Sequence, residues 1–131
     1  MAGRISQKSK QVDQPTRAWR HRVAFRFHEG EEEGRFTYGE VHRYSSRVGS
    51  FLLSVGLKPQ ERVMLLSENR PEWPISFFGI LRAGATSVPV DKELSETEVV
   101  NIARRSSATS SWCAPARSTS RWRCARARSC C

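Results

Sequence analysis

Residues 62–91 hold two short apolar runs separated by a stretch with helical spacing, and this order constrains the fold more than any other feature. Arg62–Leu66 is apolar after its first residue, as is typical of a strand covered on both faces of a parallel sheet. Pro71–Ala83 carries large apolar side chains at helical spacing, and Thr86–Val90 is the second short run. A connection of this length can join two parallel strands. The stretch therefore predicts a β-α-β unit and an α/β fold.

The residues upstream predict a β-hairpin. Apolar residues alternate between Val23 and Phe27, and Arg35-Phe36 can return as the partner strand after a charged turn at His28–Gly34. The three consecutive glutamates of this turn could suggest a metal site. No His or Asp geometry supports a ligand set, so we interpret the glutamates as a solvated loop tip.

A helix is expected to follow the hairpin. Thr37 and Glu40 have the spacing of a capping box, in which each residue bonds the main chain of the other. Gly56 is expected to end the helix as the C′ residue. Six hydrophobic residues share one predicted face of this helix: Val41, Tyr44, Val48, Phe51, Leu52 and Val55.

Ser67–Arg70 lies just past the carboxyl end of the first strand, the end that faces the ligand crevice in open α/β sheets. Asn69 can alternatively cap the next helix, with Pro71 close to its first turn; we favour this capping role. Farther on, Ser95 and Glu98 form a second capping box that opens a helix ending in Arg104-Arg105. A third parallel strand is expected after that helix.

The positive charge is concentrated in the two flanks of the chain. The 131 residues carry a formal net charge of +9, of which residues 1–20 contribute +4 and residues 107–131 contribute +5, whereas residues 21–106 hold 12 basic and 12 acidic side chains. The sequence therefore predicts a basic disordered lead (1–20), a partial α/β segment (21–106) and a disordered tail (107–131). It shows no signal-like or membrane-spanning apolar run, so a cytoplasmic protein without disulfides is expected.

Several short motifs follow one another in the order found in one enzyme family. They are TYGE at Thr37–Glu40, GLKP at Gly56–Pro59, RVMLLSEN at Arg62–Asn69, EW at Glu72-Trp73, GILRAGA at Gly79–Ala85 and VPVD at Val88–Asp91. Together they cover about residues 22–106 and resemble the N-terminal part of the adenylate-forming acyl-CoA synthetases, the AMP-binding synthetases and ligases. The chain is most similar in character to a long-chain fatty acid–CoA ligase.

This resemblance implies a function for a full-length relative. The family activates a carboxylate, such as a fatty acid, with MgATP to an acyl-adenylate and then transfers the acyl group to a thiol, commonly that of CoA. It uses a Ser/Thr/Gly-rich phosphate loop ending in Lys, an acidic motif, a ribose-binding Asp and a lysine on a mobile C-terminal domain; none of these occurs in this sequence. The resemblance therefore assigns no catalytic, cofactor-binding or metal-binding residue, and it implies that this chain is an N-terminal piece that is inactive alone.

The composition changes at residue 107, where the third strand is due. Residues 107–131 contain no Gly, Leu, Ile, Val, Phe, Asp, Glu or Lys. If the serine codons are of the TCN class, the shifted frame of Thr109–Cys113 encodes four consecutive hydrophobic residues. We therefore hypothesise a frameshift near Ser106-Ser107, in the gene or in its sequencing. Resequencing the DNA decides this hypothesis, and an intact frame with no longer homologous reading frame downstream would reject it.

Two alternatives to a ligase fragment remain open. The chain could be a small basic module whose tails contact nucleic acid or an anionic membrane, because arginines accompany Trp112 and Trp122 in the tail. It could also be a fragment that docks on a partner synthetase. Binding to one specific nucleic acid is not expected, and the oligomeric state is not predicted. Salt-dependent pull-down on nucleic acid would favour the binding module.

Overall fold

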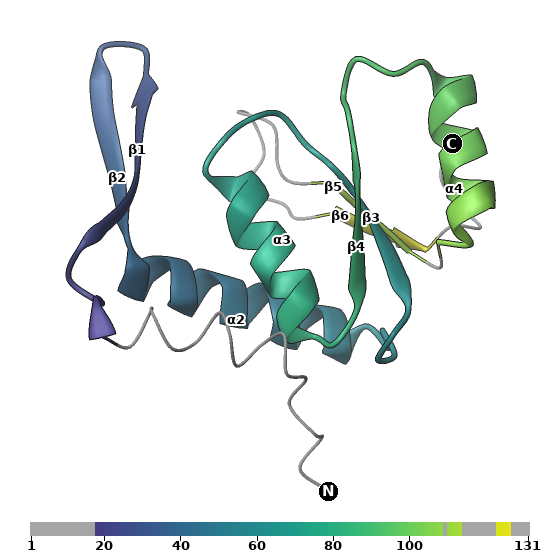
Figure 1. The fold of residues 1–131 in the computed structure, drawn as a ribbon, viewed down its shortest axis with the longest axis horizontal. Coiled ribbons are helices and arrows are strands. Elements are labelled where there is room, and N and C mark those ends of the chain that lie inside the picture. Colours follow the sequence, from purple (N-terminus) through teal and green to yellow (C-terminus); the bar gives the residue numbers. More distant parts are fainter. Residues whose placement is uncertain (1–17, 109, 114–122, 127–131) are drawn as a thin grey trace, which may run out of the picture.

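The computed structural model of the chain describes residues 18–108, 110–113 and 123–126 (Figure 1). They form a two-stranded hairpin, three helices and a four-stranded sheet. In chain order these elements are β1 (Val23–Glu29), β2 (Glu32–Thr37), α2 (Tyr38–Ser54), β3 (Arg62–Leu66), α3 (Glu72–Arg82), β4 (Thr86–Val90), α4 (Glu96–Ser106), β5 (Ser110–Cys113) and β6 (Arg123–Arg126). The α/β fold class predicted from the sequence is confirmed.

The hairpin is present, but its turn is shorter than the sequence predicted. β1 and β2 pair antiparallel until Glu29 lies opposite Glu32, so only two residues connect the strands rather than the predicted turn of residues 28–34. Gly30 has a φ of 68°. A two-residue hairpin turn requires such positive φ values, which glycine adopts without strain, and this explains how the strands continue to the tip.

Both ends of α2 are closed as predicted. The Thr37 side-chain oxygen accepts a hydrogen bond from the Glu40 amide at 3.2 Å, and the Glu40 carboxylate accepts one from the Thr37 amide at 2.8 Å. At the other end Gly56 has a φ of 90°, and the amide of Leu57 donates to the carbonyl of Leu52 at 3.1 Å. This is the Schellman pattern that ends a helix at a C′ glycine.

The buried face of α2 differs from the predicted face. Its buried residues are Val41, Ser45, Val48, Gly49 and Leu52. Phe51 and Val55, which the sequence placed on this face, are 41% and 37% exposed. Phe51 lies on the flank of the stripe that contacts α3, and Val55 follows the last helical residue, so neither reaches the core.

The predicted β-α-β unit forms the centre of the main sheet, whose strand order is β4-β3-β5-β6. β3 pairs parallel with β4 on one side and with β5 on the other, so the third parallel strand occurs where it was expected. β6 runs antiparallel to β5. Two strands thus lie within residues 107–131, which differs from the expectation of a wholly disordered tail. A sheet ladder is made by main-chain groups, which serine and arginine residues supply as well as apolar ones.

α3 begins later than the sequence predicted. Its N-cap is Pro71, which makes no side-chain capping hydrogen bond, and Asn69 is exposed. The predicted capping role of Asn69 is therefore wrong. The chain turns here through main-chain bonds, from the Arg70 amide to the Glu68 carbonyl at 2.8 Å and from the Trp73 amide to the Arg70 carbonyl at 2.9 Å. These bonds place the first helical turn beyond the reach of Asn69.

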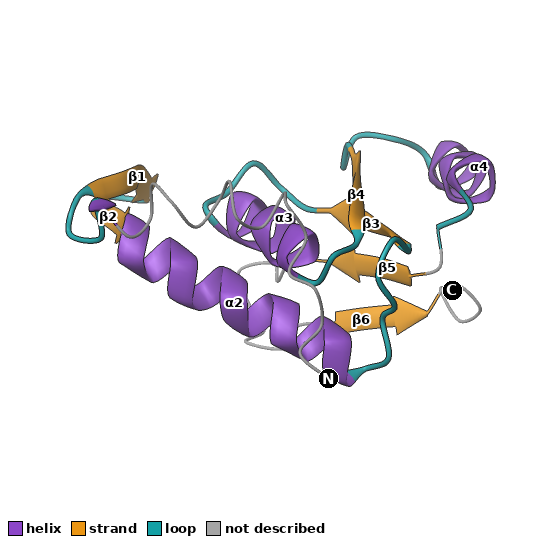
Figure 2. Cartoon of the chain, turned by 60° about the horizontal axis from the view of Figure 1, so that its bottom comes forward, coloured by secondary structure: helices purple, strands orange, loops and turns teal. Residues whose placement is uncertain are grey.

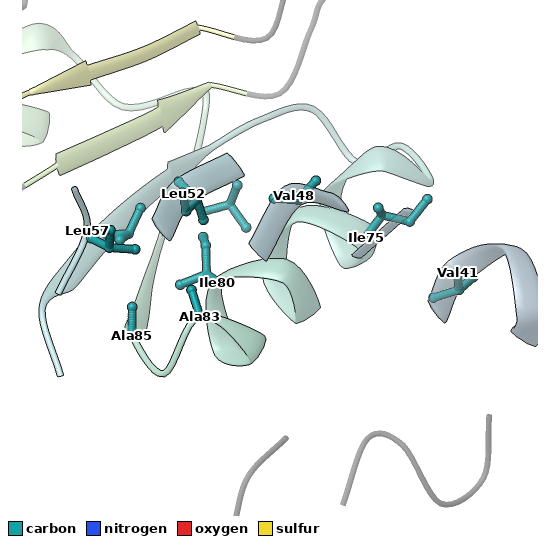
Figure 3. Packing of buried hydrophobic residues seen from close by; sticks show 10 residues of the cluster. Val41, Val48, Leu52, Leu57, Ile75, Ile80, Ala83 and Ala85 are labelled. Atoms are coloured by element: carbon teal, nitrogen blue, oxygen red, sulfur yellow. The ribbon is translucent and has the colours of Figure 1, made fainter. Parts of the chain in front are cut away.

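The main core lies where α2 and α3 pack together and against β3 (Figure 3). Leu52, Val63, Leu65 and Ile80 are fully buried in it. Figures 1 and 2 show α3 on one side of the main sheet and α4 on the other. No helix in the described part of the chain is long and apolar enough to cross a membrane.

The two capping boxes make stability depend on pH. Hydrogen bonds from Thr37 hold the pKa of Glu40 below its usual value, and hydrogen bonds from Ser95 do the same for the pKa of Glu98. A carboxyl group whose pKa is lower in the folded state stabilises the fold above its unfolded pKa, and this contribution is lost as the pH falls through the folded value.

We therefore expect urea unfolding midpoints to fall as the pH is lowered from 5 toward 3, and to fall less steeply in Glu40→Gln and Glu98→Gln variants. Glu96→Gln, which removes a neighbouring exposed carboxylate from the same helical turn as Glu98, is the matched control and should keep the wild-type slope. Equal slopes for all four proteins would show that the capping carboxylates do not carry this pH dependence.

Candidate functional site

The carboxyl edge of the main sheet is the place where this topology favours a ligand site. The chain leaves β3 for β4 through α3, then returns past β3 to β5 through α4. Right-handed crossovers in opposite directions place the two helices on opposite faces, as Figures 1 and 2 show. Strand order therefore reverses between β3 and β5, and in open α/β sheets ligands bind outside the carboxyl ends of the strands at such a switch point.

The loop after β3 contributes Ser67–Arg70 to this edge, and the loop after β4 contributes Asp91–Glu93. The charged groups of these loops pair with one another: the Lys92 ammonium lies 3.9 Å from the Glu68 carboxylate and 3.6 Å from that of Glu93. All three side chains are at least half exposed. Exposed ion pairs of this kind add little to stability. They therefore do little to hold the two loops in one position.

Arg70 and Glu72 lie where the chain passes from the loop after β3 into α3. The Arg70 guanidinium donates to the Glu72 carboxylate at 3.4 Å, and both side chains are mostly covered. Behind them the Trp73 and Phe77 rings stack with centroids 5.3 Å apart, partly buried against the main core. These aromatic rings are explained by packing on the core, and we assign them no ligand.

The side chains described at this edge do not include a metal-binding cluster. Within residues 18–108, 110–113 and 123–126, no group of three His, Cys, Asp or Glu side chains comes close enough together to hold a metal ion. Of the acids at this edge, Glu68 and Glu93 are paired with Lys92 and Glu72 is paired with Arg70. Asp91 Oδ1 accepts a hydrogen bond from the Glu93 amide at 3.0 Å. We therefore derive no catalytic step from these residues. That this chain lacks catalytic and cofactor-binding residues remains a prediction of the sequence.

The topology and motifs together agree with comparisons to known proteins. The AMP-binding enzyme family matches residues 12–128. The chain belongs to this family. The match extends into both flanks of the segment 21–106 that the sequence singled out, and the predicted division into lead, segment and tail remains a prediction.

Individual relatives support the same assignment. The chain is 40% identical over 72 residues to coprinoferrin synthetase of Coprinopsis cinerea, covering 55% of this chain and 3% of that protein. It is 35% identical over 79 residues to 4-coumarate–CoA ligase of Vanilla planifolia, covering 60% of this chain and 14% of that enzyme. The chain thus spans only a small share of the relatives that it matches.

A solved structure shares the fold. The fatty acid AMP ligase from Legionella pneumophila superposes with a TM-score of 0.71 at 23% identity, over 78% of this chain and 18% of that one. The predicted resemblance to adenylate-forming enzymes is confirmed at the level of family and fold.

Proposed function

We propose that this AMP-binding family chain supplies the N-terminal β-α-β layer of a carboxylate-activating ligase and has no activity alone. The observation that carries the proposal is the fold: a chain with the parallel strand order β4-β3-β5 superposes on a fatty acid AMP ligase with a TM-score of 0.71 but covers only 18% of that enzyme. In the full ligase the carboxylate attacks the α-phosphorus of ATP, the bond to pyrophosphate breaks, and a thiol then displaces AMP.

The substrate of that ligase is a carboxylic acid, and a fatty acid is our first candidate. The sequence motifs are most similar in character to a long-chain fatty acid–CoA ligase, and one structural neighbour is a fatty acid AMP ligase. Other relatives are named as a nonribosomal peptide synthetase or as a 4-coumarate–CoA ligase, so ATP, magnesium and an acyl-accepting thiol are the shared requirements that we propose. We place the enzyme in the cytoplasm.

A chimera tests the scaffold role directly. Residues 22–106 would replace the matching segment of the Vanilla planifolia 4-coumarate–CoA ligase. If the segment is scaffold, the chimera should retain coumarate activation within about tenfold and keep the acyl preference of its recipient, because contacts to the reacting atoms are unchanged. The isolated chain should catalyse no ATP–pyrophosphate exchange with fatty, aromatic or amino acids.

Two results would contradict this proposal. Exchange catalysed by the isolated chain would show that it holds a working site. A shift of acyl preference in a folded chimera would show that the segment lines the acyl pocket. A chimera that also carries Leu52→Ala is the matched control, since it removes a buried residue of the segment without approaching the recipient's catalytic residues.

A further inference from the structure

A short turn at Trp19–Arg22 is fixed against the start of α2. The Gly39 amide donates to the Arg20 carbonyl and the Tyr38 amide to the Arg22 carbonyl, both at 3.0 Å. With Glu40 bonded to the capping threonine, the first three helical amides all have partners inside the protein. The helix terminus therefore offers none of these amides to an anion, and any attraction for anions at this place must come from side chains.

Four exposed arginines belong to this turn or to the neighbouring elements β2 and α2: Arg20, Arg22, Arg35 and Arg43. The first two belong to the turn itself. The other two lie close enough to Glu40 to lower its pKa, after the larger effect of its hydrogen bonds to Thr37. Within the described part of the chain, no ion pair neutralises any of the four. The Glu40 carboxylate is hydrogen-bonded to Thr37 rather than paired with an arginine, so the net charge around the turn is positive.

Trp19 stands out among these charges because it is 47% exposed. The Arg22 guanidinium lies 5.7 Å from the centroid of its ring, and the Tyr38 ring meets it edge-on with centroids 6.4 Å apart. We call Trp19 and the four arginines the Trp19 patch. It joins an amphipathic aromatic ring to a cluster of cations at one end of the molecule.

The acidic side chains of the hairpin lie at its other end. Glu31, Glu32 and Glu33 are exposed at or next to the tip, and at the rise expected of a strand Glu32 lies about 17 Å and Glu33 about 13 Å from Thr37 at the base. Figure 1 shows the hairpin extending away from the N-terminal end of α2. Arg20, Arg22 and Arg43 thus lie in the elements at the base of the hairpin, whereas Arg35 lies partway along β2, two residues from Glu33.

We propose that the Trp19 patch docks the protein on an anionic phospholipid surface. A plane that contacts the patch keeps the acidic tip away, and tryptophan favours the boundary between water and acyl chains. Residues 1–17, which precede the patch directly, add a further net charge of +3. A nucleic acid fits less well, because Arg22 already occupies one face of the ring on which a base would stack. Cytoplasmic leaflets carry the anionic lipid that this surface requires.

Vesicle co-sedimentation of the full chain tests this proposal. We expect binding to vesicles of phosphatidylcholine mixed with phosphatidylserine, a loss of binding as salt is raised, and little binding to phosphatidylcholine alone. The combined variant Arg20→Gln, Arg22→Gln, Arg35→Gln and Arg43→Gln should weaken binding by several hundred-fold, since each basic residue near such a surface contributes about fivefold. Trp19→Ala should weaken binding without changing its salt dependence.

The matched control removes four arginines from the tail: Arg117→Gln, Arg121→Gln, Arg126→Gln and Arg128→Gln. It lowers the net charge equally, so a loss as large as that of the patch variant would assign the binding to overall charge and overturn the proposal. Equal binding to neutral vesicles would overturn it too, as would binding to a single-stranded oligonucleotide with none to mixed vesicles. Circular dichroism confirms that each variant is folded.

Discussion

Replacing Leu52 with alanine is expected to lower the free energy of unfolding by about 2–5 kcal/mol. Leu52 is 0% exposed and lies in the cluster where α2 packs on α3 and β3 (Figure 3). Its carbonyl also accepts the bond from Leu57 that closes the end of α2, and both side chains belong to that cluster. Truncation would leave a cavity at the junction of helix and sheet. Urea unfolding followed by circular dichroism measures the loss.

The adjacent residue provides a matched control. Leu53 is the same residue type on the same helix, but it is 49% exposed. We expect Leu53→Ala to change the free energy of unfolding by about 0.5 kcal/mol or less, as is usual for surface positions. Similar losses for both substitutions would mean that the buried face of α2 is not the one described.

Gly79→Ala is expected to destabilise the protein by about 1–3 kcal/mol, although alanine is the better helix former by about 1 kcal/mol. A Cβ at this position would lie 2.5 Å from Cγ1 and 2.6 Å from Cβ of Val48, and 3.1 Å from the Ser45 carbonyl oxygen. The branched valine side chain has little rotamer freedom in a helix. The added methyl group must therefore push α2 and α3 apart.

A double-mutant cycle with Val48→Ala tests this contact. Val48→Ala alone should destabilise the fold by opening a cavity, but in the Gly79→Ala background it should make room for the new methyl group. The loss in the double variant should fall short of the sum by at least about 0.5 kcal/mol. Strict additivity in thermal or urea unfolding would contradict the close approach of the two helices at Gly79.

The elements that the sequence predicted correctly are those specified by local interactions. The capping boxes at Thr37 and Ser95 involve groups three residues apart, and each forms as expected. The β3 and β4 bounds were also predicted, because each apolar run is short and clearly bounded. The place of β5 followed from the alternation of strands and helices, although only two of residues 110–113, Trp112 and Cys113, are hydrophobic. Whether this segment is read in a shifted frame remains a prediction for the DNA to test.

The errors concern features that depend on tertiary contacts. The Asn69 cap failed because main-chain turns start α3 beyond it. Phe51 was predicted to be buried because periodicity alone does not show on which side of α2 the helix α3 packs. The charge of residues 21–106 sums to zero, yet the fold separates the arginines near the start of α2 from the glutamates of the hairpin tip. The net charge of the segment does not show this separation, which is visible only in the three-dimensional structure.

The position of β3 in the sheet also has a consequence for folding during synthesis. Val63 pairs with Ser87 in β4 and with Ser110 in β5, which follows it by 47 residues. A ribosome needs about 2–9 s to add that many residues at common translation rates. Throughout this interval one edge of an apolar strand has no partner, and such an edge can recruit a strand from another chain. The nascent protein is therefore most exposed to mispairing before its tail is made.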